Sequence, residues 1–174
     1  MAGDKPAAGS GPFPGLAPTL RRRLYGYGWL WVWRPLAVAL VCVDFDRVVE
    51  VFDAYGREAC ERMLQAAADQ VQAGHGLTHR VLSLACPVEW VVVVPGGRRA
   101  ALAWAENVRA RVEQHARVGS HPVTIRIGIE AETRGLRRPC RRPLLMRAEL
   151  AEREANDSGG NCIRLYQPDQ YAIR

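Results

Sequence analysis

The sequence predicts an α+β domain in which helices flank a mainly antiparallel sheet. Apolar runs of strand length alternate with longer stretches that repeat apolar residues at helical spacing. Two of the strand-like runs are separated by only a short turn, as in a hairpin. After a tail or helix the order is β, α, α, β, β, α, β, α, β, which resembles the split βαβ pattern. A chain of 174 residues suits one such domain.

The first half of the chain begins with a tail and reaches a buried strand. Residues 1–12 carry too few apolar side chains to offset the entropy of ordering them, so we expect a flexible tail before a domain at 13–174. The continuous apolar run 36–43 predicts a strand that is buried on both faces.

Residues 48–71 have the periodicity of an amphipathic helix. Val48, Val51, Phe52 and Tyr55 are expected to form one apolar stripe, which continues beyond Gly56. Glycines on either side of His75 end the helix.

The second half of the chain supplies the hairpin, the clearest half-buried strand and the last helices. Residues 123–129 alternate apolar and polar side chains, as expected of a strand with one buried face. The expected strands are 81–85, 90–94, 121–130 and 162–166, and the expected helices are 100–118 and 144–155.

Composition excludes several classes of protein. The net charge of +6 comes almost wholly from arginine, because Lys5 is the only lysine, and this bias is weak evidence for a nucleic-acid partner. Five cysteines without a CxxC pair favour a reducing, cytoplasmic location. The apolar stretch 24–43 is interrupted by Arg34 and Pro35, so each part is shorter than the roughly 20 residues that span a bilayer. We expect neither a membrane segment nor a secretion signal.

Four short motifs carry a family resemblance. DFD at 44–46 follows the first strand, DAYG stands at 53–56, PFPGL at 12–16 precedes them, and GGN at 159–161 precedes the last strand. Their spacing and the element order resemble the GGDEF domain family over about residues 13–166. These are bacterial palm-fold nucleotidyl cyclases that join two GTP into cyclic di-GMP.

The resemblance implies a ferredoxin-like palm in a single domain. Residues 13–35 would form an N-terminal turn followed by a helix or an aromatic arm, and residues 36–166 would form the palm core. Gly15 and Leu16, in the opening turn, match a ligand-binding segment of the family.

The signature of the family is degenerate in this chain. Where the family has Gly-Gly-Asp/Glu-Glu-Phe, the sequence reads Cys86, Pro87, Val88, Glu89 and Trp90. The resemblance implies a Mg²⁺ site made by two carboxylates, the first of which would be Asp44. The second would fall at Val88, which has no oxygen. Cys86 and Pro87 replace glycines that let nucleotide lie close to the backbone.

Base and phosphate contacts are also altered. The family's guanine-reading Asn falls at Phe52 and its partner Asp at Glu61, while phosphate-binding Lys and Arg fall at Asn156 and Gly160. The product-inhibition motif RxxD is absent from 77–80. These substitutions predict a chain without diguanylate cyclase activity, acting as a nucleotide-sensing or protein-binding module in cyclic di-GMP signalling. No cofactor is required, and Mg²⁺ would accompany a bound nucleotide only.

Each acidic candidate also has a plainer interpretation. Asp44 and Asp46 could bind a metal or serve as a turn and helix cap. Glu89 could replace the lost ligand or be an exposed hairpin residue, and Cys86 is more simply a thiol than a nucleophile. If the metal interpretation holds, the alternative function is a divergent Mg²⁺-dependent nucleotidyl cyclase that uses Asp44, Asp46 and Glu89 and stacks a base on Phe52.

Two further features bear on partners. Trp29, Trp31 and Trp33 alternate with other residues and could form an aromatic surface for a protein partner or self-association, or belong to the core. The arginine-rich loop 134–142 raises a third alternative, a palm that binds nucleic acid, although a solvated loop is the commoner outcome. Guanine nucleotide or cyclic di-GMP are the small ligands expected, and nucleic acid is not.

Overall fold

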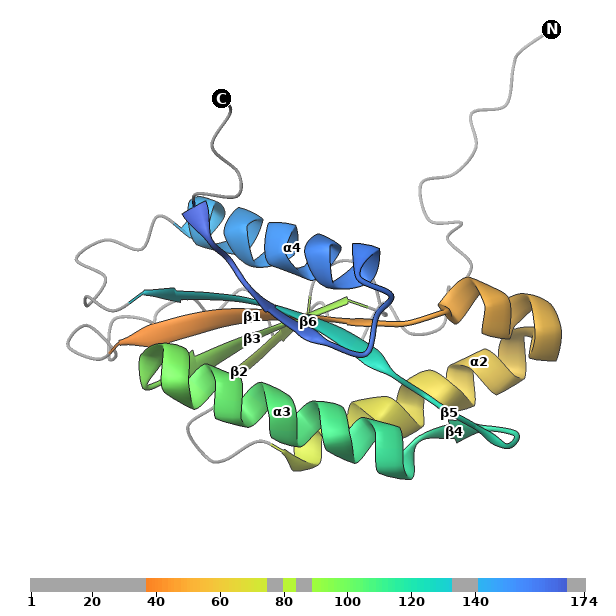
Figure 1. Ribbon diagram of the computed structural model, residues 1–174. Coiled ribbons are helices and arrows are strands. Elements are labelled where there is room, and N and C mark those ends of the chain that lie inside the picture. Colours follow the sequence, from red (N-terminus) through yellow and green to blue (C-terminus); the bar gives the residue numbers. More distant parts are fainter. Residues whose placement is uncertain (1–36, 75–79, 84–88, 133–140, 169–174) are drawn as a thin grey trace, which may run out of the picture.

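The computed structural model describes residues 37–74, 80–83, 89–132 and 141–168 (Figure 1). Its elements, in chain order, are β1 (Val38–Phe45), α2 (Val48–Ala73), β2 (Arg80–Ser83), β3 (Glu89–Pro95), α3 (Gly97–His115), β4 (Arg117–Val118), β5 (His121–Pro122), β6 (Ile125–Glu132), α4 (Arg141–Asp157) and β7 (Ile163–Leu165).

Five of the strands form one sheet in the order β2-β3-β1-β6-β7. The central strand β1 pairs antiparallel with both β3 and β6, β2 is antiparallel to β3, and β7 runs parallel to β6. In Figure 1, α4 lies on one side of the sheet and α2 and α3 lie on the other. This arrangement confirms the predicted α+β fold with an antiparallel sheet and flanking helices.

The main core lies between the sheet and helices α2 and α3. Val41, Val43 and Phe45 of β1 point into it and are almost fully buried. On the opposite face of β1, Cys42 is also fully buried, in a smaller cluster with Ala148 of α4. A strand covered on both faces has no need of polar residues, which explains the continuous apolar run seen in the sequence.

The predicted apolar stripe of α2 is wrong at two positions. Val48 and Val51 pack against the core, but Phe52 and Tyr55 are 36% and 49% exposed. The reason is Gly56, whose backbone (φ 78°, ψ 177°) is not helical and divides α2 into two segments. The break shifts the helical phase, so the buried face beyond Gly56 does not continue onto Phe52.

Several boundaries also differ from the prediction, and the expected strand 121–130 is divided into β5 and β6. Helix α3 ends at His115 because Ala116 is extended (φ −99°, ψ 128°), and the short hairpin of β4 and β5 follows it. Strand β1 continues to Phe45, and α4 begins at Arg141, within the expected arginine-rich loop. None of the helices in the described ranges has the length and apolar character needed to cross a membrane.

Candidate functional site: an arginine among carboxylates

A row of charged residues crosses three strands at one end of the sheet, on the face that α4 covers. The register places Asp44 of β1 opposite Glu89 of β3 on one side and opposite Arg126 of β6 on the other. Because neighbouring strands lie about 5 Å apart, these side chains are near neighbours. Asp44 therefore has a like charge on one flank and an opposite charge on the other.

Gly128, two residues after Arg126 on the same face of β6, lets α4 approach closely. A Cβ at Gly128 would lie 2.1 Å from the Ala148 carbonyl oxygen and 2.2 Å from the Glu152 backbone nitrogen. Only glycine permits this contact between helix and strand backbones. The close approach places Glu152 over the charged end of the sheet.

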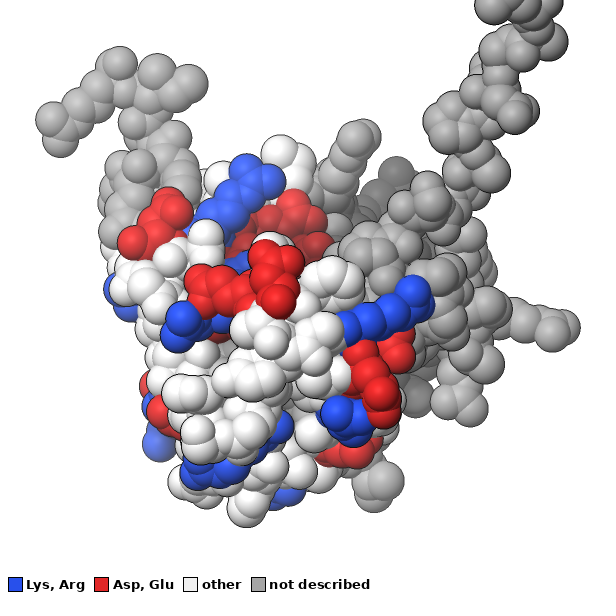
Figure 2. Space-filling model, turned by 90° about the vertical axis from the view of Figure 1, so that its right-hand side faces the viewer, with Lys and Arg blue, Asp and Glu red and all other residues white. Residues whose placement is uncertain are grey.

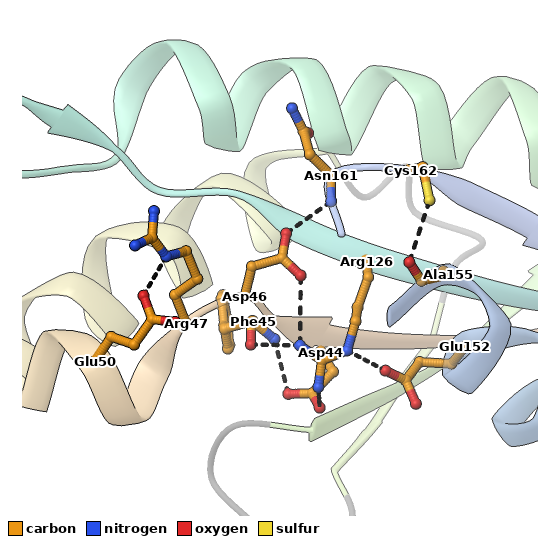
Figure 3. Close-up of polar contacts among 10 residues, drawn as sticks. All are labelled: Asp44, Phe45, Asp46, Arg47, Glu50, Arg126, Glu152, Ala155, Asn161 and Cys162. Atoms are coloured by element: carbon orange, nitrogen blue, oxygen red, sulfur yellow. Dashed lines mark hydrogen bonds and ion pairs between the residues drawn. The ribbon is translucent and has the colours of Figure 1, made fainter. Parts of the chain in front are cut away.

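The guanidinium of Arg126 holds this end of the sheet together (Figure 3). Its Nη2 contacts the Asp44 carboxylate and its Nε the Glu152 carboxylate, while Nη1 donates to the Phe45 carbonyl oxygen at 2.8 Å and lies 3.4 Å from Asp46 Oδ1. The side chains are largely buried, with Arg126 15% exposed and Glu152 12% exposed. All three guanidinium nitrogens are thus engaged, as expected for an arginine withdrawn from water. Arg126, Asp44, Asp46 and Glu152 are called the Arg126 cluster below.

One guanidinium does not offset all the negative charge around it. Burial raises the pKa of Asp44 to about 6, even though Arg126 acts to lower it. Burial also raises the pKa of Glu89, and the neighbouring carboxylates of Asp44, Glu149 and Glu152 raise it further. Glu89 lies half-buried within β3, so the exposed-hairpin interpretation is wrong.

Asp46 has a structural partner of its own. Its Oδ2 accepts a hydrogen bond from the backbone N–H of Asn161 at 2.8 Å, and its carboxylate packs against Gly160, where a Cβ would lie 2.5 Å from Oδ1. Asn161 is held in turn by Arg109 and Glu113 of α3. Asp46 thus ties the turn before β7 to the end of β1. The helix-cap interpretation is wrong, because α2 has Arg47 at its N-cap and no side-chain cap hydrogen bond.

The two positions expected to read guanine lie on α2. Phe52 stands beside two other exposed apolar residues of the first helical segment, Val49 and Tyr55, and Val49 is 71% exposed. Glu61 accepts a hydrogen bond from Arg57 Nε at 2.9 Å. Figure 2 views the end of the molecule where α2 begins and shows uncharged side chains gathered in the lower part of this face, with charged ones around them.

Several predicted residues lie outside the described part of the chain: Gly15, Leu16, Trp29, Trp31, Trp33, Cys86, Pro87 and Val88, with the tail 1–12. Trp90 is described, and its ring makes an edge-to-face contact with Phe45 at 6.2 Å between centroids. Asn156 is exposed near the end of α4.

A Mg²⁺ ion at Asp44, which the resemblance implies as a candidate, does not fit the contacts of the described residues. The Asp44 oxygens that a cation would need already contact Arg126 and the backbone N–H of Phe45. Among the described residues, no group of three or more His, Cys, Asp or Glu is arranged to hold a metal ion. The sequence prediction missed Arg126 and Glu152, because the alternation of apolar and polar residues placed Arg126 on the polar face of its strand.

Solved structures similar to this chain are GGDEF domains. The active GGEEF domain of a diguanylate cyclase from Vibrio cholerae aligns with TM-score 0.65 and 17% identity over 75% of this chain and 83% of that one. The GGDEF domain of DgcB from Caulobacter crescentus, in complex with c-di-GMP, aligns with TM-score 0.64 and 14% identity, covering 75% and 78%.

A third similar structure contains a protein partner. Diguanylate cyclase SiaD from Pseudomonas aeruginosa, in complex with its activator SiaC, aligns with TM-score 0.63 and 23% identity over 74% of this chain and 50% of that one. No protein-family model matches the sequence, and no curated protein is significantly similar to it. The structural similarity shows that this chain has the fold of GGDEF domains.

Proposed function

We propose that this chain is a signalling module with the GGDEF-domain fold that lacks diguanylate cyclase activity and acts by binding. The observation that carries the proposal is the outward face of α2. At the two positions where the resemblance puts guanine-reading groups, Phe52 has no hydrogen-bonding side-chain atom and Glu61 is engaged by Arg57. A guanine edge placed there would lose hydrogen bonds to water, gain none from Phe52, and meet a Glu61 carboxylate that is already paired with Arg57.

The metal side of the site supports the same proposal. Asp44 is in contact with Arg126, and Val88, at the second ligand position, has no side-chain oxygen to coordinate Mg²⁺. Nucleotidyl transfer depends on such a cation to stabilise charge on the phosphates. Both halves of the substrate site, base and phosphate, are therefore altered.

A binding role fits what remains on the surface. Val49, Phe52 and Tyr55 give α2 an exposed apolar face, which is the kind of surface that protein partners cover. Among the similar structures, SiaD is in complex with an activator protein and DgcB with c-di-GMP. We propose that this chain takes a protein partner or a guanine nucleotide such as cyclic di-GMP. A cytoplasmic location agrees with the free cysteines Cys42, Cys60 and Cys162.

The catalytic part is tested by incubating the purified chain with each nucleoside triphosphate and Mg²⁺ or Mn²⁺. An active diguanylate cyclase serves as the positive control, and products are separated by chromatography. We expect no cyclic or linear dinucleotide. Formation of any such product by this chain would overturn the proposal and support the divergent cyclase that uses Asp44, Asp46 and Glu89.

The binding part is tested on the aromatic segment. We propose that the protein partner, or a second copy of the chain, docks through Trp29, Trp31 and Trp33. Replacing all three by serine should weaken assembly, measured by light scattering and sedimentation, while the thermal unfolding transition stays cooperative. Loss of the cooperative transition would place the tryptophans in the core and contradict this docking surface.

A further inference from the structure

The Arg126 cluster places a fixed positive charge where a metal-dependent site of this fold would need a cation. We propose that Arg126 is the resident cation of this site, so that the chain keeps the charged end of its sheet folded without a divalent metal and admits none. The inference goes beyond the proposed function and does not rest on it. It concerns metal binding in the absence of any nucleotide or protein partner.

The contacts of Arg126 explain why a metal ion is kept out. A divalent cation needs several oxygen ligands at about 2.0–2.6 Å, so to bind Asp44 it would have to displace the guanidinium from that carboxylate. Arg126 is also held by Glu152 and by the Phe45 carbonyl oxygen. These contacts keep the guanidinium in place, and two cations within one small group of carboxylates would repel each other strongly.

Glu152 positions the Arg126 guanidinium and helps to offset the free-energy cost of burying its charge. A guanidinium that is 15% exposed loses most of its hydration and needs charged, hydrogen-bonding partners to replace it. The glycine at position 128 lets α4 bring Glu152 to Nε of Arg126. The guanidinium thus bridges β1, β6 and α4, which is the structural work that a bound metal would otherwise do.

The charge balance also restricts what can bind beside the cluster. Glu89 and Glu149 add negative charge beside the cluster, and each acts, as burial does, to raise the pKa of Cys42. With Arg126 fully engaged, the surroundings remain negative. A triphosphate normally approaches such carboxylates through a shared cation, and here that cation is replaced by an arginine whose three nitrogens already contact protein oxygens. The site therefore disfavours nucleoside triphosphates.

The test is a Mn²⁺ titration of the full chain without nucleotide. Binding is measured by calorimetry, and stability is measured by thermal unfolding. The variants are Arg126→Ala and a matched control, Arg147→Ala. Arg147 also joins α4 to β6, through Glu130 at 3.3 Å, but its side chain is 46% exposed. For both the wild type and Arg147→Ala, we expect no saturable Mn²⁺ binding and no change of Tm when Mn²⁺ is added.

Arg126→Ala should unfold at a lower temperature than the wild type and should gain a Mn²⁺ site. At Mn²⁺ concentrations about tenfold above its Kd, the Tm of this variant should rise by about 3–6 °C. Adding Asp44→Asn to Arg126→Ala should abolish the gain. If Arg126→Ala does not fold without metal, the titration is repeated with the double variant Arg126→Ala, Glu152→Gln. This variant lacks both charges of the ion pair between Arg126 and Glu152.

Two results would overturn the inference. The first is saturable Mn²⁺ binding to the wild type with a raised Tm. The second is a folded Arg126→Ala variant, or where that does not fold the folded double variant Arg126→Ala, Glu152→Gln, that shows no Mn²⁺ binding, because the carboxylates would then not be a cation site that Arg126 fills. Neither result would by itself restore cyclase activity, so the proposed function is judged separately by its own product assay.

Discussion

Asp44 is the residue whose ionisation the fold opposes most clearly, and this gives a quantitative prediction. Its pKa is raised from 3.8 to about 6, first by burial, while the contact with Arg126 acts in the opposite direction. An acid whose pKa is higher in the folded state stabilises the fold only while it is protonated. Its contribution is fully present below about pH 4 and is lost as the pH rises to about 6.

The substitution Asp44→Asn removes this dependence. A rise of about 2 pKa units corresponds to about 3 kcal/mol, and the side chain of Asp44 is only 19% exposed, so solvent screens little of it. Wild type and variant should have similar stabilities near pH 4. At pH 7.5 the variant should be the more stable by up to about 3 kcal/mol.

Urea unfolding of both proteins at intervals between pH 4 and pH 8 measures the difference. Asp53→Asn, at an exposed position on α2, is the control and should track the wild type throughout. The reasoning is refuted if Asp44→Asn is less stable than the wild type at pH 7.5 by an amount that does not change down to pH 4. That result would mean that the contact with Arg126 outweighs the effect of burial.

Three further predictions concern the surroundings of the site. Gly128→Ala should destabilise the chain by about 3 kcal/mol or more in urea unfolding, because its Cβ would overlap the backbone of α4, and a loss below about 1 kcal/mol would contradict this packing. Asn161→Ala should lower the free energy of unfolding by about 1–2 kcal/mol, because side-chain hydrogen bonds are lost and alanine is strained at the backbone φ of 46°. Asn161→Gly should lower it by less, because glycine adopts this φ without strain. Equal losses for the two variants would show that φ plays no part. Phe52→Ser should change stability by less than about 1 kcal/mol because the ring is partly exposed, and a larger loss would assign Phe52 to the core.

Elements with strong periodicity could be predicted from the sequence. The apolar run of β1 identified a strand covered on both faces, and the alternation along β6 identified a strand with one apolar face in the main core. The hairpin of β4 and β5 was missed, since strands of two residues leave no periodic signal. The division of α2 at Gly56 was missed because many helices tolerate a glycine, and only its φ of 78° shows that this one ends a segment.

Two acidic residues of the site, Asp44 and Asp46, could be predicted, but Glu152 and the counter-ion could not. Asp44 and Asp46 stand together in the sequence, whereas Arg126 reaches them from the neighbouring strand and Glu152 from a helix on the covered face. The alternation of β6 suggested that Arg126 faces water. Its burial depends on the close approach of α4 over Gly128, which is a packing relation between distant segments that no local pattern encodes.

The replacement of a metal ion by Arg126 is tested most directly by a crystal structure of the full chain grown with Mn²⁺ and GTP. Anomalous scattering identifies Mn²⁺ without reference to any assumed ligand. We predict no anomalous peak beside Asp44, with the Arg126 guanidinium in contact with Asp44 and Glu152. A Mn²⁺ peak bound to the Asp44 carboxylate, with Arg126 turned away and GTP density alongside, would contradict the resident cation.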